Sequence, residues 1–294
     1  MEEQKRRIFS GREITDEDIE MILWVLDNYK GLSRTETIFT ISELLGWVRP
    51  EDGVIKARQC KDCLEALEAE GLITLPKARE INMSSARFLE ELPKYDSVTG
   101  SGNIELIRPE NSKENKLWRS YIEEYHPLGY KREDGASMRY FIKYEEMELG
   151  CIQITSAAWA LENRDKWIGW DKETRISNLR LIANNTRYLL LPWAQMPYLA
   201  SKALGRLAKQ IQSDWLKRYG YAPVLLETFV DSSLYEGTCY KAANWIYLGE
   251  TKGRGRDDRY HNNRVAKKLI FVYPLQRDFR EVLLGEKPYR RTEI

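Results

Sequence analysis

The feature of the sequence that most restricts the fold is a long amphipathic segment between two apolar ones. Residues 200–220 read ASKALGRLAKQIQSDWLKRYG, with apolar side chains at helical spacing, Ser201 at the expected start and Gly220 at the expected end. RYLLLPW (187–193) comes before this segment and APVLLETFV (222–230) after it, and both are typical of buried strands. Strand, long helix and strand together predict an α/β fold.

The segments around this unit extend the same plan. Helices are expected at LWRSYIEEYH (117–126), DKETRISNLRLIANNT (171–186) and GTCYKAAN (237–244), and strands at MRYFIKY (138–144), LGCIQITSAAW (149–159), WIYLGET (245–251) and KKLIFVYPL (267–275). In this order the elements resemble the second half of the acyl-CoA N-acetyltransferase (GNAT) fold, which implies a mixed sheet.

The turn before the long helix disfavours acetyltransferase activity. The GNAT fold holds the pyrophosphate of coenzyme A with backbone N–H groups of a glycine-containing loop at this point. Here the turn reads AQMPYLASKALG, with Pro197 and Tyr198 where glycines would be needed and Gly205 already inside the helix.

Residues 1–82 predict an N-terminal winged helix-turn-helix domain. Three amphipathic segments, at 14–30, 33–46 and 55–71, are followed by the short apolar run LITL (72–75), which is expected to be a strand. In such a domain Lys56, Arg58 and Lys61 would face phosphates or base edges of DNA. The many acids of the segment leave a protein-binding winged helix as the alternative. Residues 83–115 are polar and predict a linker or extended segment, and residues 116–294 form the expected GNAT-like core domain.

Composition limits the class of protein. The 294 residues have a formal net charge of +1, so affinity for nucleic acid must come from local clusters of cations. No apolar run approaches the ~20 residues that span a bilayer, and no signal peptide is recognisable. Four cysteines make no disulfide framework, so a cytoplasmic protein is expected. Cys60 and Cys63 form a single Cys-x-x-Cys pair, for which helix packing is favoured over zinc binding.

Cys239 lies in the polar turn LYEGTCYKAAN (234–244), and two interpretations are open. In the first turn of a short helix, free N–H groups would favour a thiolate and make Cys239 a nucleophile. Glu227 interrupts the apolar run of the preceding strand, which indicates a functional carboxylate. Either Glu227 or His126 would transfer the proton of the attacking thiol. Tyr240 is the alternative nucleophile, and simple packing of Cys239 is the alternative to catalysis.

A cationic segment follows this turn. Between Lys252 and Lys268, seven cations and two anions give a local net charge of +5. The expected contacts with phosphate are made by Lys252, Arg254, Arg256, Arg259, Arg264 and Lys267. A solvated loop is the simpler alternative. Asp231, Asp257 and Asp258, together with Glu227 and His261, form a fallback site for Mg²⁺; no other cofactor is expected.

Several strings, in this order, resemble the DruA proteins of Druantia anti-phage systems and their mobile-element relatives. They are SRTETIFTISELLGW (33–47), LWRSYIEEYHPLGY (117–130), SAAWALENRDKWIGW (156–170), NNTRYLLLPW (184–193), GTCYKAANWIYLGETKGRGR (237–256) and IFVYPL (270–275). The resemblance implies association with foreign or mobile DNA, and with other proteins of a defence system or mobile element. Some relatives are transposase-like.

Taken together, these features predict a DNA-binding protein that breaks DNA strands and can rejoin them. Cys239 would attack a phosphodiester, and Arg254 and Arg256 would stabilise the phosphoryl charge. The joining of two DNA ends would favour a homodimer. The alternative is a DNA-recognition component without catalysis, which recruits partner enzymes to the DNA.

Overall fold

The computed structural model describes residues 7–9, 11–28, 32–47, 56–77, 88–131, 135–158, 161–251 and 267–289. The chain divides into two compact units, one made of residues 1–81, 134–136 and 216–221, and the other of residues 82–133, 137–215 and 222–294. Among the helices described, none combines the length and the apolar content that a membrane crossing requires.

The smaller unit contains a β-hairpin and three helices. They are β1 (Arg7–Phe9), β2 (Arg12–Ile14), α1 (Asp16–Asn28), α2 (Arg34–Leu44) and α3 (Ala57–Ala69). Thr15 caps the start of α1, because its Oγ1 accepts a hydrogen bond from the backbone N–H of Asp18 (3.2 Å). Cys60 and Cys63 of α3 are fully buried in the helical core. Burial raises the pKa of both thiols to about 12, so these cysteines pack as small apolar groups.

The strand expected at residues 72–75 is not formed. The backbone N–H of Leu72 donates to Leu67 O at the end of α3 (3.0 Å), and that of Leu75 donates to Glu68 Oε1 (2.7 Å). These two donors are therefore taken by α3, and Ile73 and Leu75 are buried without strand pairing among the described residues. The expected wing has no β-structure there.

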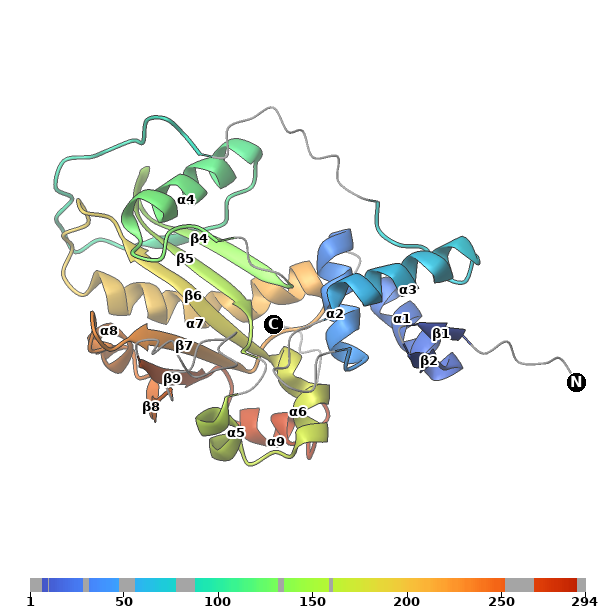
Figure 1. Cartoon of the computed structure of the whole chain (residues 1–294). Helices are drawn as coiled ribbons and strands as arrows, with labels where there is room; N and C mark the ends of the chain where they lie inside the picture. Colours follow the sequence, from blue (N-terminus) through green and yellow to red (C-terminus); the bar gives the residue numbers. More distant parts are fainter. Residues whose placement is uncertain are drawn as a thin grey trace, which may run out of the picture. The chain divides into compact units, whose positions relative to one another are not determined.

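The larger unit is built on a seven-stranded sheet in the order β3-β4-β5-β6-β7-β9-β8 (Figure 1). The strands are β3 (Glu105–Ile107), β4 (Ser137–Tyr144), β5 (Met147–Ser156), β6 (Ile182–Leu190), β7 (Leu225–Asp231), β8 (Ile246–Glu250) and β9 (Lys268–Pro274). β6 and β7 pair in parallel, and the other neighbouring strands pair antiparallel. The predicted α/β class with a mixed sheet is confirmed.

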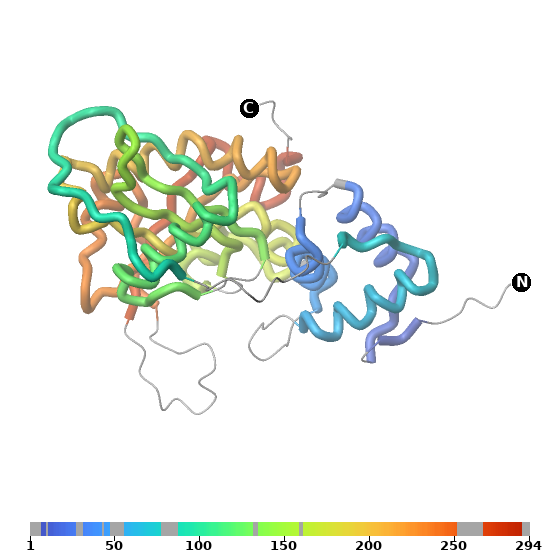
Figure 2. The backbone as a smooth tube through the Cα atoms, turned by 90° about the horizontal axis from the view of Figure 1, so that it is seen from above, coloured from blue at the N-terminus to red at the C-terminus, as the bar shows by residue number. Residues whose placement is uncertain are grey.

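Helices cover both faces of this sheet. They are α4 (Ser112–Tyr125), α5 (Glu162–Ile168), α6 (Lys172–Asn178), α7 (Leu199–Tyr219), α8 (Thr238–Ala242) and α9 (Phe279–Leu283). On β4 the guanidinium of Arg139 lies over the ring of Trp118 of α4, while the hydroxyl of Tyr140 bonds Asp214 of α7 (2.9 Å). Because consecutive side chains of a strand point to opposite faces, α4 and α7 lie on opposite faces. We call them the α4 face and the α7 face; Figure 2 shows α7, in orange, along one side of the sheet.

Most of the elements expected in the larger unit are present, but one of its predicted helices is wrong in part. α7 ends where expected, and Gly220 follows it with φ +77°. The predicted helix 171–186 is wrong beyond α6 and a short 3-10 turn, because β6 already begins at Ile182. Residues 182–185 are buried between β5 and β7, and pairing on both sides overrides their helical pattern.

The sheet divides between β6 and β7. Their pairing ends at Asn185 and Thr228, after which β6 continues beside β5 and β7 continues beside β9. We call this point the fork.

Candidate functional site

The fork is closed on the α7 face by neutral polar and aromatic side chains. The hydroxyl of Tyr240, in α8, donates to Asn185 Oδ1 (2.8 Å), and Thr228 Oγ1 donates to the carbonyl of Asn185 (2.9 Å). The ring of Tyr240 also stacks on Phe271 of β9, with centroids 5.7 Å apart. α8 is therefore fixed to strands on both sides of the fork.

Gly237 allows this close approach of α8. Its φ is +68°, and a Cβ at this position would lie 2.5 Å from Phe271 Cε2. Both the backbone conformation and the space require glycine. The sequence predicted a short helix that starts at Gly237, and α8 does begin directly after this glycine.

Cys239 lies in the first turn of α8 and is partly exposed. Burial raises the pKa of its thiol, although the backbone N–H groups of Tyr240 and Cys239 act in the opposite direction. The expected thiolate is therefore not stabilised: in the isolated protein the thiol is protonated at neutral pH. Tyr188 of β6 lies close to α8, because its ring centroid is 6.1 Å from that of Tyr240, the residue after Cys239.

Tyr240 has a structural role. Its side chain is buried, its hydroxyl is held by Asn185, and burial raises the pKa of that hydroxyl well above its ordinary value. A phenol in this position is not available to attack a substrate. The structure thus favours Cys239 over Tyr240 as the group at the fork that a ligand can reach.

Glu227 is also structural, contrary to the prediction that it handles a proton. It is fully buried, and its carboxylate accepts hydrogen bonds from Arg164 Nη1 (2.8 Å) and from the backbone N–H of Ala158 (2.7 Å). Arg164 is equally buried and also bonds Asp165 Oδ1 (2.8 Å). Arg175 reaches the other oxygen of Asp165 (3.2 Å), so the charges form a closed network.

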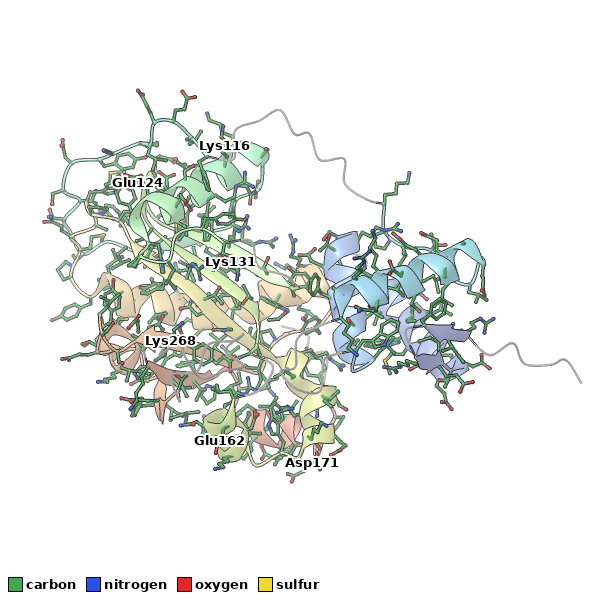
Figure 3. The ribbon with its side chains drawn as sticks, in the orientation of Figure 1. Lys116, Glu124, Lys131, Glu162, Asp171 and Lys268 are labelled. Atoms are coloured by element: carbon green, nitrogen blue, oxygen red, sulfur yellow. The ribbon has the colours of Figure 1, made fainter. Side chains whose placement is uncertain are left out.

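This network lies at one end of the α4 face. Figure 3 marks that region with Glu162, the first residue of α5, and Asp171, whose carboxylate caps α6 by accepting from Thr174 N (2.7 Å). For Arg164, burial alone would lower the pKa of the guanidinium, but Glu227 and Asp165 raise it, so the guanidinium stays charged.

The sheet separates Cys239 from both predicted proton carriers. Thr228 points toward Tyr240 on the α7 face, so its neighbour Glu227 points to the α4 face. Tyr188 of β6 contacts α7 and Tyr240, so it points to the α7 face, and the preceding residue Arg187 points to the α4 face. His126, at the end of α4, is a neighbour of Arg187 and therefore also lies on the α4 face. The predicted catalytic set is not assembled.

His126 itself is neutral at physiological pH. Burial, with a smaller effect of Arg187, lowers the pKa of its imidazole to about 4. Its Nδ1 accepts a hydrogen bond from the backbone N–H of Leu128 (3.1 Å). It therefore stabilises the turn after α4.

The predicted metal ligands and phosphate contacts are only partly described. Asp231 accepts hydrogen bonds from Ser233, which lower the pKa of its carboxyl group. No cluster of histidine, cysteine, aspartate or glutamate with the spacing of a metal site occurs in the described part of the chain. Lys267 pairs with Glu250 (3.5 Å). Lys252, Arg254, Arg256, Asp257, Asp258, Arg259, His261 and Arg264 lie outside the described residues.

In the smaller unit, the three predicted DNA contacts differ in their surroundings. Lys56 immediately precedes α3 and is partly exposed, and Arg58 is exposed. Lys61 is 3.8 Å from Glu65, one turn later on α3.

The sequence reasoning missed Asn185, Thr228 and Tyr188 at the fork. The signal for Asn185 was available, because Asn184 and Asn185 lie in a strand whose first two and last two residues are apolar. Its interpretation required the knowledge that β7 and α8 meet β6 at this point.

Residues 77–265 match the model of a protein family described as Druantia protein DruA. The comparison with curated proteins finds no match. Among solved structures, the chain is similar to a ribosomal L7/L12 alpha-N-protein acetyltransferase, with 11% identity, a TM-score of 0.32 and coverage of 48% of this chain and 72% of that one.

Two further solved structures are similar over longer stretches. One is AAC(6')-Ib bound to acetyl-CoA, with 17% identity, a TM-score of 0.37 and coverage of 61% of this chain and 94% of that one. The other, from Desulfovibrio desulfuricans, is described as of the GNAT family; it has 11% identity, a TM-score of 0.38 and coverage of 59% of this chain and 100% of that one. Nothing about the activity of this chain follows from these likenesses.

Proposed function

This chain belongs to the DruA family, whose model covers residues 77–265, and on that premise we propose that it binds DNA and breaks its strands with Cys239 as the attacking group. The observation that carries the proposal is the position of Cys239. It is partly exposed at the fork, whereas the neighbouring hydroxyl of Tyr240 is buried and engaged by Asn185.

The proposed step is a displacement at phosphorus. Cys239 Sγ forms a bond to the phosphorus of a phosphodiester, the bond from phosphorus to one deoxyribose oxygen breaks, and the thiol proton is transferred to that leaving oxygen. Attack by another deoxyribose hydroxyl on the same phosphorus would reverse the step and rejoin a strand. Arg254 and Arg256 are proposed to stabilise the charge on the phosphoryl oxygens.

The raised pKa of Cys239 sets a condition on this step. The thiol must lose its proton as the bond to phosphorus forms, and Glu227 lies on the other face of the sheet in an ion pair. We therefore assign the transfer of the proton to the substrate's leaving oxygen, directly or through water. The fallback use of Mg²⁺ at Asp231, Asp257 and Asp258 remains the alternative route to cleavage.

The N-terminal unit is proposed to bind DNA as a winged-helix variant. Its three helices and the exposed side chain of Arg58 at the start of α3 support this role. Lys61 is less favourable, because Glu65 is near its ammonium group.

The test uses labelled single- and double-stranded DNA, with and without Mg²⁺, on denaturing gels. We expect a covalent protein–DNA adduct that is lost in Cys239→Ser and kept in Tyr240→Phe. An adduct that persists in Cys239→Ser would exclude the cysteine. Cleavage without an adduct, and only with Mg²⁺, would transfer the role to metal chemistry.

A second function is favoured by the same pKa and by the engagement of Glu227. With a protonated thiol, and with Glu227 and His126 on the opposite face of the sheet, the protein would serve as a recognition component that recruits partner enzymes of a defence system to DNA. In that case Lys56→Ala and Arg254→Ala weaken DNA binding, and no strand is cut even when partner DNA ends are supplied for joining.

A further inference from the structure

One side of α7 carries a row of cations. Lys202, Arg206 and Lys209 follow one another at intervals of four and three residues, which places them on one stripe of the helix, and all three are exposed. At a rise of about 1.5 Å per residue, the row is about 10 Å long. The opposite side of α7 is apolar and buried, as Ala203, Leu207 and Ile211 show. The row is therefore a stable feature of the surface.

These cations are not neutralised by neighbouring acids. Neither Lys202, Arg206 nor Lys209 forms an ion pair with any residue that the structure describes. The carboxylate of Asp214, on the same helix, instead accepts hydrogen bonds from Tyr140 and Gln210 (2.9 and 2.8 Å). The row therefore presents net positive charge to solvent.

The row ends in a groove of about 430 Å³ between α7 and the edge strand β3. It is lined by Glu105, Leu106, Ile107, Arg206, Lys209, Gln210 and Ser213. Gln210 Nε2 donates to the carbonyl of Leu106 (3.1 Å) and so occupies an acceptor at the edge of β3. This bond disfavours the addition of a peptide strand. The groove holds one carboxylate, that of Glu105, against the two cations Arg206 and Lys209, so its charged side chains leave a net positive charge that, with the hydroxyl of Ser213, matches phosphate.

The other end of the row begins with an exposed aromatic side chain. Tyr198, four residues before Lys202, is 80% exposed and has φ +59°, which is strained for a residue with a large side chain. Close by, the hydroxyl of Tyr188 donates to the carbonyl of Ala200 (2.7 Å), and the ring centroid of Tyr188 lies 6.1 Å from that of Tyr240, the residue after Cys239. The row of cations thus starts beside the fork.

We propose that Tyr198, Lys202, Arg206 and Lys209 form a track for a single, unpaired nucleic-acid strand. An unpaired base stacks on the ring of Tyr198, and the phosphates that follow contact the three cations and enter the groove beside β3. A duplex keeps its bases stacked inside and cannot use Tyr198 in this way. The track deepens the proposed function, on which it rests, because it names single-stranded DNA as the substrate that reaches Cys239.

The cations are tested by fluorescence anisotropy with a labelled single-stranded oligodeoxynucleotide over a range of salt concentrations. Loss of three phosphate contacts in Lys202→Gln/Arg206→Gln/Lys209→Gln should reduce the slope of log affinity against log salt by about 2. The matched control, Lys94→Gln/Lys113→Gln/Lys172→Gln, changes the same charge at exposed positions of the same unit and should leave the slope unchanged. Equal slopes for the two triple variants would overturn the track.

The aromatic contact has a separate test. Tyr198→Ala should weaken the binding of single-stranded DNA by about 5- to 150-fold, whereas Tyr198→Phe and duplex binding should change little. An equal loss for duplex DNA, or an equal loss in Tyr198→Phe, would contradict base stacking.

Two further readouts separate this inference from the proposed function. If the Cys239 adduct forms equally in the track variant and in its control, cleavage stands and the track is wrong. If the wild-type protein binds no DNA but binds poly-glutamate, and the track variant does not, the groove accepts acidic peptides and both proposals fail.

Discussion

On the α4 face of the large sheet, Glu227 and Arg164 are both fully buried and balance each other's charge, whereas on the α7 face the groups at the fork are uncharged and the cations of α7 lie outside. A buried charge is tolerated only with a partner and hydrogen bonds, so its interactions are used within the fold and not for a ligand. Groups that remain unpaired, such as Lys202 and Arg206, are found at the surface. The contrast supports our proposal that the nucleic-acid ligand binds on the α7 face.

The strongest test of this contrast is Glu227→Gln. It leaves the guanidinium of Arg164 buried beside a neutral amide, and we expect the free energy of unfolding to fall by about 3–5 kcal/mol. The measurement is urea denaturation. Glu227→Met/Arg164→Met, which removes both charges, is the matched control and should cost much less. Unchanged stability in Glu227→Gln together with complete loss of DNA cleavage would return Glu227 to a catalytic role.

The second test concerns the approach of α8 to the fork. Gly237→Ala introduces a Cβ near the ring of Phe271 at a positive φ, and we expect a loss of about 2–4 kcal/mol. Gly169→Ala is the control, because Gly169 has φ +91° but no atom within 4 Å of the added Cβ, and should lose about 1–2 kcal/mol. If the two variants are equally stable in thermal unfolding, α8 does not pack on β9 as described.

A third prediction follows from His126 at the end of α4. The pKa of its imidazole is about 4 in the folded state and about 6.5 in an unfolded chain, so the unfolded state binds the proton first as the pH falls. The free energy of unfolding should therefore decrease between about pH 6.5 and pH 4. After allowance for partial exposure, the loss is about 1–2 kcal/mol.

His126→Asn keeps a hydrogen-bond acceptor for Leu128 but has no proton to bind. The contribution to the pH dependence should be absent in this variant, which chemical denaturation at several pH values can measure. An identical pH profile in His126→Asn would show that other groups are responsible.

The smallest effect is expected at the neutral hydrogen bond of the fork. Tyr240→Phe leaves Asn185 Oδ1 buried without its donor, at a cost of about 1 kcal/mol. Tyr247→Phe is the control. The side chain of Tyr247 is exposed, so the loss of its hydroxyl leaves no buried group without a partner and should change the stability little. A loss above that of Glu227→Gln would reverse the proposed contrast between the two faces.

The fold was more predictable than the site. α7 and the strands on either side of it follow from local periodicity, which the sequence shows directly. β6 was partly mistaken for a helix, because residues 182–186 acquire their strand conformation from β5 and β7, which are distant along the chain. Local propensity does not contain that pairing.

Glu227 shows why the site was harder. A carboxylate in an apolar strand correctly indicated a special environment, but its partner Arg164 is 63 residues away along the chain. His126 posed the same difficulty. It is far from Cys239 along the chain, and the sequence did not determine on which face of the sheet it would lie. Residue types predict what a group can do, while its partners are fixed by the topology.

The parallel pairing of β6 with β7 also has a consequence for how the chain reaches its structure. β4, β5 and β6 join antiparallel neighbours in chain order, whereas β7 reaches β6 only after the 21 residues of α7. Pairings between distant segments form slowly, because a long loop must close before they gain contacts. The fork therefore belongs to the late-forming part of the domain, and Cys239 meets its neighbours only when the carboxyl-terminal strands have been made and have docked. During synthesis on the ribosome, this order would keep the thiol apart from the fork until β9 has been made.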